Sequence, residues 1–90
     1  MDQNLVVVEV KPINAKSKGI SKDVKNLAYF VSPQAGYRVG VMLVYGDDGR
    51  GITRFEKALR NAGVGALRLL WQRNPGEPAK EVGPNEERVG

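Results

Sequence analysis

The sequence predicts a small α/β domain with three mainly parallel strands and two covering helices, in the order strand, helix, strand, helix, strand. Apolar runs typical of strands occupy residues 5–10, 37–46 and 66–72, and the segments between them repeat apolar residues at helical spacing. Strands that alternate with helices usually join as parallel neighbours through right-handed crossovers. We therefore expect one sheet covered by two helices.

The first strand and the first helix follow from two different spacings. The run at residues 5–10 contains Glu9 and is followed by Lys11. Because side chains alternate between the two faces of a strand, Glu9 and Lys11 share one face with Val7. The helix that follows is predicted up to the break at residues 32–33, from the apolar positions Ile20, Val24, Leu27, Ala28 and Val31.

The remaining elements are a central strand, a second helix and a third strand. Residues 37–46 form a nearly continuous apolar run, which is typical of a strand covered on both faces. The second helix is predicted from Ile52, Phe55, Ala58, Leu59 and Ala62, and Gly63 ends it. Thr53 and Glu56 fit a capping box at its start. Residues 66–72 complete the sheet, with Leu67, Leu69 and Trp71 on one face.

Length and composition limit the chemistry that this chain can perform. Ninety residues with 41% hydrophobic content allow one domain with a modest core. The chain has no cysteine and no histidine, which excludes disulfides, thiolate catalysis, Cys/His zinc sites and a Ser-His-Asp triad. A bound metal must therefore have oxygen ligands. The longest apolar run is much shorter than the roughly 18 residues of a membrane span, so we expect a cytoplasmic protein and no membrane partner.

The positive charge is concentrated in the part of the chain that is predicted to fold. Residues 1–72 hold eleven Lys and Arg against six Asp and Glu, whereas residues 73–90 hold three against four. Residues 74–90 are rich in Pro, Gly and Glu, so the sequence predicts a domain over residues 1–73 and a flexible polar tail over 74–90. A moderately basic domain fits an ordinary soluble surface or a surface that attracts polyanions.

Glu9 and Lys11 are the candidate catalytic residues. A carboxylate and an amine at one strand end can hold a divalent cation and position a phosphate. The same pattern also fits a simple ion pair at the end of a strand, because short E-x-K strings are common.

The order of elements around these two residues resembles a known family. The strand with Glu9 and Lys11, the basic helix and the strand at residues 39–45 resemble the PD-(D/E)XK nuclease superfamily of restriction endonucleases and Holliday junction resolvases, over residues 4–72. The resemblance implies a restriction endonuclease-like half-core in which Glu9 binds Mg²⁺ and Lys11 lies beside the attacked phosphate. It would make the protein, if active, a Mg²⁺-dependent endonuclease.

The second acid of that family is missing from its usual position. In the family it lies on a preceding strand, and here the only acid before Glu9 is Asp2. A seven-residue offset along a strand places Asp2 roughly 23 Å away and on the opposite face. We interpret residues 1–90 as the rear half of such a core, with Met1 as a possible truncation point. The unpaired edge at residues 4–10 predicts a homodimer or a partner chain that supplies the missing acid.

Each predicted helix carries a basic ridge opposite its apolar positions. These ridges supply the candidate nucleic-acid-binding residues Lys22, Lys25 and Tyr29 on the first helix and Arg50, Arg54 and Lys57 on the second. Contacts from such ridges to phosphates would hold DNA or RNA without reading its sequence. The alternative for each ridge is an ordinary solvated helix face.

Asp47 and Asp48 form the one pair of adjacent acids among residues 1–72. Their position before Gly49 and the second helix favours turn formation and helix capping. A ligand site is the alternative, because open α/β sheets gather ligands at the carboxyl ends of their strands.

Two functions remain open from the sequence. The first is a nuclease-like nucleic-acid-binding domain that hydrolyses a phosphodiester with Mg²⁺ if a partner supplies an acid. The second is a non-enzymatic binding or assembly module that keeps the fold without the chemistry.

Overall fold

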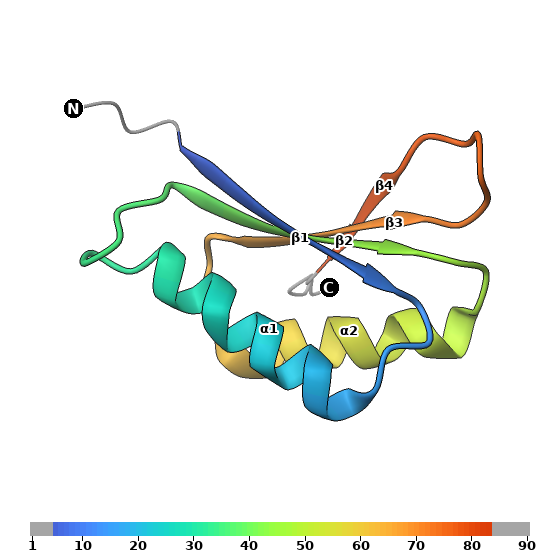
Figure 1. The fold of residues 1–90 in the computed structure, drawn as a ribbon, viewed down its shortest axis with the longest axis horizontal. Coiled ribbons are helices and arrows are strands. Elements are labelled where there is room, and N and C mark those ends of the chain that lie inside the picture. Colours follow the sequence, from blue (N-terminus) through green and yellow to red (C-terminus); the bar gives the residue numbers. More distant parts are fainter. Residues whose placement is uncertain (1–4, 84–90) are drawn as a thin grey trace, which may run out of the picture.

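Two helices cover one face of a four-stranded mixed sheet. The computed structural model describes residues 5–83. Their elements are β1 (Val6–Pro12), α1 (Ser17–Phe30), β2 (Val39–Tyr45), α2 (Gly49–Ala62), β3 (Leu67–Gln72) and β4 (Lys80–Gly83). The strands lie in the order β1-β2-β3-β4; β1, β2 and β3 are parallel, and β4 runs antiparallel to β3. Both helices lie on the same side of this sheet (Figure 1).

The core lies between the helices and the sheet. Each helix buries one apolar stripe, which is the face that the 3.6-residue spacing predicts. The sheet contributes alternate residues of β2 and β3, as the two-residue period of a strand requires. The buried apolar side chains are Ile20, Val24, Leu27, Met42, Val44, Ile52, Phe55, Leu59, Leu67 and Leu69.

The ends of α2 show how local sequence positions this helix. Asp48 is the N-cap, and its Oδ1 accepts hydrogen bonds from the backbone N–H groups of Arg50 (3.0 Å) and Gly51 (3.2 Å). The predicted capping by Asp48 is therefore confirmed. The capping box that begins at Thr53 is wrong, because Thr53 lies inside the helix and its Oγ1 donates to the Gly49 carbonyl oxygen. Gly63 ends the helix in the left-handed region, with φ of 68°.

The predicted α/β class and the two helices are confirmed, but the strand count is wrong. The sheet has four strands instead of three, because β4 pairs with the outer edge of β3. Residues 80–83 are therefore not the loose chain that was expected for the whole of 74–90. Residues 84–90 and Asp2 lie outside the described residues. The restriction endonuclease-like half-core stays a prediction from the resemblance.

Within residues 5–83, the central strand is covered on one face only. Gly40, Met42 and Val44 are buried beneath the helices, whereas Val41 and Leu43 on the opposite face are only half-buried. No described helix lies on that face (Figure 1). Within residues 5–83, neither helix is long and apolar enough to cross a membrane.

Candidate nucleic-acid interface

Glu9 and Lys11 lie on the same face of β1, as the strand period predicts. Glu9 is paired in register with Met42, which is buried beneath the helices, so this face is the helix side of the sheet. Lys11 does not need Glu9 as a partner, because its Nζ lies 2.8 Å from Oδ2 of Asp23 on α1. The side chains of this ion pair are 24% and 15% exposed. The pair ties the edge strand to the first helix.

The acids of the described chain are dispersed. Within residues 5–83, no three Asp, Glu, His or Cys side chains gather where they could hold a metal ion together. Asp47 and Asp48 have separate structural roles, because Asp48 caps α2 whereas Asp47 Oδ1 accepts a hydrogen bond from Arg73 Nε at 2.8 Å. Glu9 therefore belongs to no cluster of three potential ligands within residues 5–83.

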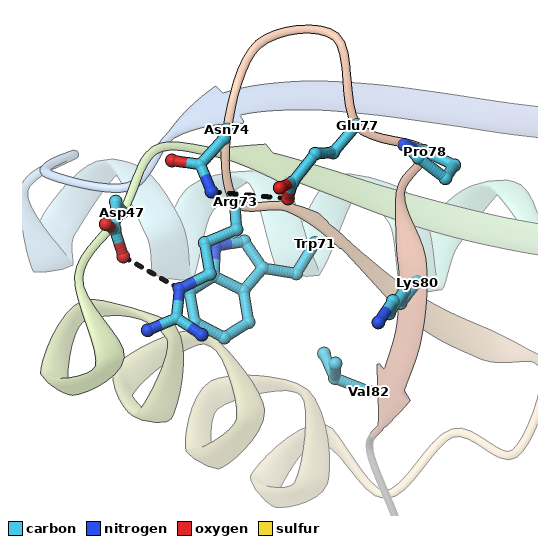
Figure 2. A pocket seen from close by; sticks show the side chains of 8 residues that line it. All are labelled: Asp47, Trp71, Arg73, Asn74, Glu77, Pro78, Lys80 and Val82. Carbon is cyan, nitrogen blue, oxygen red and sulfur yellow. Dashed lines mark hydrogen bonds and ion pairs between the residues drawn. The ribbon is translucent and has the colours of Figure 1, made fainter.

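A hollow beside Trp71 was not predicted from the sequence. It has a volume of about 440 Å³ and lies where β2 and β3 end, between α2 and the β3–β4 connection (Figure 2). Its lining side chains are Asp47, Trp71, Arg73, Asn74, Glu77, Pro78, Lys80 and Val82. Two basic and two acidic side chains line it, so the hollow has no net charge.

Arg73 is held inside this hollow by neighbours on two sides. Its guanidinium carbon lies 5.3 Å from the centroid of the Trp71 ring. The hydrogen bond that Arg73 Nε donates to Asp47 Oδ1, together with the charge of that carboxylate, raises the pKa of Arg73 above its ordinary value. Trp71 is fixed as well, because its Nε1 donates to the Gly46 carbonyl oxygen at 2.7 Å. Arg73 therefore has partners at the surface of the chain, although its side chain and that of Asp47 are more than half exposed.

The excess positive charge of the described chain lies on the helix layer. The two helices with their N-caps, Lys16 and Asp48, carry eight Lys and Arg and three Asp and Glu, whereas the rest of residues 5–83 carries five Lys and Arg and four Asp and Glu. Of the three acids, Asp23 is paired with Lys11 and Asp48 caps α2. We call the exposed cations of this layer the basic helix face; they are Lys16, Lys18, Lys22, Lys25, Arg50, Lys57 and Arg60.

The structure brings most of the predicted nucleic-acid-binding residues to this face. Lys22, Lys25, Arg50 and Lys57 are exposed, and Tyr29 is 57% exposed. A shallow depression along α1 is lined by Lys16, Lys18, Gly19, Ser21, Lys22, Lys25 and Asn26. A groove of about 320 Å³ separates the helices and is lined by Ser17, Ile20, Ser21, Arg54, Lys57, Ala58 and Asn61. Hydroxyl and amide groups thus lie between two rows of cations.

Arg54 differs from the other predicted contacts because it is already engaged. Its guanidinium donates hydrogen bonds to the carbonyl oxygens of Ile13 (3.1 Å) and Ala15 (2.8 Å) and to Ser17 Oγ (3.3 Å). These bonds join α2 to the connection between β1 and α1. Arg54 therefore braces the two helices against each other, a role that a helical ridge alone does not reveal.

Replacing Arg54 by alanine is expected to destabilise the fold by about 1–3 kcal/mol, because a charged donor is removed and two half-buried carbonyl groups lose partners. Arg54→Lys is the matched control, since it keeps the charge but loses the planar fork of donors. Urea unfolding followed by circular dichroism measures both. A bracing role predicts that lysine recovers less than half of the loss, and full recovery by lysine would contradict it.

A search against protein-family models, curated proteins and solved structures found no match to this chain. The resemblance to the PD-(D/E)XK superfamily therefore stays a prediction from the sequence.

Proposed function

We propose that this protein binds nucleic acid through the basic helix face. The observation that carries the proposal is the separation of charge, with eight cations and three acids on the helices and their N-caps, and five cations and four acids elsewhere in residues 5–83. A concentrated positive surface attracts a polyanion over a distance of about a Debye length, roughly 10 Å at moderate salt. A surface of the same area with equal numbers of cations and acids does not attract a polyanion in this way.

The arrangement of these cations favours contact with phosphates over reading of bases. The lysines of α1 follow one exposed side of the helix, and Arg50 and Lys57 follow the exposed side of α2. Long flexible ammonium groups bind phosphates as point charges and carry little sequence information. Tyr29 offers one aromatic ring at the end of the α1 row, on which an unpaired base can stack. We therefore propose that the protein binds nucleic acid with weak sequence preference and binds single strands more tightly than duplexes.

Cleavage is a separate proposal, and it rests on the resemblance. Glu9 would hold Mg²⁺ and Lys11 would steady the phosphate, but Lys11 would first have to leave Asp23, and a partner chain at the β1 edge would have to supply another acid. The geometry favours the alternative of a non-enzymatic binding module, acting in the cytoplasm. An oligonucleotide that stays intact with Mg²⁺ during binding would support this alternative.

The test is a fluorescence anisotropy titration of labelled single-stranded DNA, RNA and duplex DNA with the native chain and with K22Q/K25Q. Both lysines are exposed and have no ion pair among the described residues, so the fold is expected to persist. Loss of two phosphate contacts should lower the affinity by roughly tenfold at low salt and reduce the slope of log K against log salt by about two.

R38Q/K80Q is the matched control, because it removes the same charge from exposed positions outside the helix layer. It is expected to change affinity by less than about threefold, since the total charge matters less than contact with phosphates. Equal losses in the two double variants would show attraction to net charge alone and would contradict a defined interface. A native chain that does not bind any of the three probes at low salt would overturn the proposal.

A further inference from the structure

The face of the sheet opposite the helices is apolar and uncovered by the described chain. Val6, Val8 and Val10 on β1 are 53%, 51% and 55% exposed, and Tyr45 on β2 is 47% exposed. We call this surface the open face; its apolar side chains are Val6, Val8, Val10, Val39, Val41, Leu43, Tyr45 and Leu70. Figure 1 shows both helices on the other side of the sheet.

The strand register makes these side chains one continuous surface. Val8 lies beside Val41, and Val10 lies beside Leu43, which in turn lies beside Leu70. Parallel sheets occur almost only where both faces are covered, and contiguous apolar patches of this kind mark interaction sites. The covering partner must therefore be apolar where it meets β1 and β2.

Charge identifies a second copy of the chain as a suitable occupant. The side chains on β1 and β2 of the open face carry no charge, so two copies bury no ionised group there. Arg68, on the β3 part of the same face, lies 3.5 Å from Glu81, so this part of the contact carries an ion pair without net charge. The basic helix faces of the two copies would point in opposite directions, separated by both sheets and by more than a Debye length. Contact through any part of the helix layer would instead bring like charges together.

The size of the surface fits a weak dimer. β1 and β2 have seven residues and β3 has six. At about 4.8 Å between strands and about 3.3 Å per residue, the three strands give a footprint of roughly 320 Å². Because side chains project from the sheet, the accessible area buried is larger than this footprint, and two copies together would bury on the order of 700–1,000 Å². This area is below the roughly 1,600 Å² of a standard interface and within the range of weak interfaces.

We propose that two copies of this chain pack sheet against sheet through their open faces. The dimer has four layers, helix, sheet, sheet and helix, with the two sheets about 10 Å apart. It carries one basic helix face on each outer surface. This differs from the dimer predicted through the strand edge at residues 4–10, because here side chains and not backbone groups make the contact.

The experiment combines sedimentation equilibrium with amide and methyl NMR spectra of the native chain, from about 10 µM to about 1 mM, the range that a weak interface requires. We expect a reversible dimer with concentration-dependent shifts at the methyl groups of Val8, Val41, Leu43 and Leu70 and little change along α1 and α2. The variant Val8→Lys, at a half-exposed position, is expected to stay monomeric over the same range. Gln34→Lys adds the same charge at an exposed loop position and is expected to dimerise like the native chain.

Three results would overturn the proposal. The first is a native chain that stays monomeric at the highest concentration. The second is a dimer whose shifts are confined to backbone amides of β1, which indicates edge pairing. The third is a dimer that survives Val8→Lys. If Val8→Lys does not fold, the shift map of the native chain still decides between the open face and the edge.

Discussion

Replacing Phe55 by alanine is expected to lower the free energy of unfolding by about 3–5 kcal/mol. Phe55 is fully buried on α2, in the core cluster that also contains Leu27 of α1 and Met42 of β2. Its removal leaves a cavity where the two helices and the sheet meet. A chain of this size has a total stability of roughly 5–13 kcal/mol, so the loss is a large fraction of it.

Urea unfolding followed by circular dichroism measures this change, with Phe55→Leu as the matched control. Leucine fills most of the space and is expected to cost less than about half as much. The midpoint should shift without a large change in slope, since the surface exposed on unfolding is nearly the same. A loss below about 1 kcal/mol for alanine would show that the core does not depend on this ring.

Phe55→Ala also tests whether the basic helix face must be folded to bind. The variant keeps every cation of the native chain but weakens the packing that holds α1 and α2 on the sheet. Nucleic-acid affinity should therefore fall in urea or at temperatures that unfold the variant but not the native chain. Equal affinity of the folded and unfolded chains would assign binding to composition and not to the interface.

Local spacing was sufficient to predict most of the fold. Both helices bury apolar positions that recur every three or four residues, and the first three strands lie where short apolar runs occur. The side-by-side position of Glu9 and Lys11 followed from the strand period alone. These features depend on neighbours in the sequence, so a single chain is enough to reveal them.

β4 and the open face could not be predicted in the same way. β4 has the sequence Lys-Glu-Val-Gly, with one apolar side chain, and its pairing depends on the exposed edge of β3. Strand formation of this kind is decided by long-range contact and not by propensity. The apolar run of β2 indicates that both faces of the strand are buried, but it does not show whether the same chain or a partner covers the second face.

The candidate site shows the same limit for charged side chains. The helical ridge correctly predicts that Lys22 and Lys25 are exposed, but it cannot distinguish them from Arg54, which turns toward the β1–α1 connection. Likewise Asp23 pairs with Lys11, 12 residues away on another element, and not with the lysines beside it on α1. Pairs formed across elements become visible only when the packing is known.

Replacing Gly46 by alanine is expected to destabilise the fold by about 2–5 kcal/mol, from backbone strain and overpacking together. Gly46 ends β2 with φ of 127°, a conformation that residues with a side chain rarely adopt. A Cβ atom at this position would overlap the side chain of Ile13, whose own Cβ would lie 2.9 Å away. The clash is therefore close to the backbone, and rotation of a flexible side chain cannot relieve it.

The backbone of Gly46 cannot move aside without further loss. Its N–H donates to the Gln72 carbonyl oxygen at 3.0 Å, and its own carbonyl oxygen accepts from Trp71 Nε1 at 2.7 Å. Gly49→Ala is the matched control in the same connection, because a Cβ there meets nothing within 4 Å and its φ is not in the left-handed region. This control is expected to be neutral or slightly stabilising, by up to about 1 kcal/mol.

A double-mutant cycle with Ile13→Ala separates the two causes of the Gly46 effect. If steric overlap dominates, Gly46→Ala should cost less in the Ile13→Ala background than in the native chain, with a coupling of about 1–3 kcal/mol. If the left-handed backbone dominates, the two losses should add. Urea unfolding of the four chains measures the coupling. A Gly46→Ala chain as stable as the native one would contradict both the backbone strain and the overlap with Ile13.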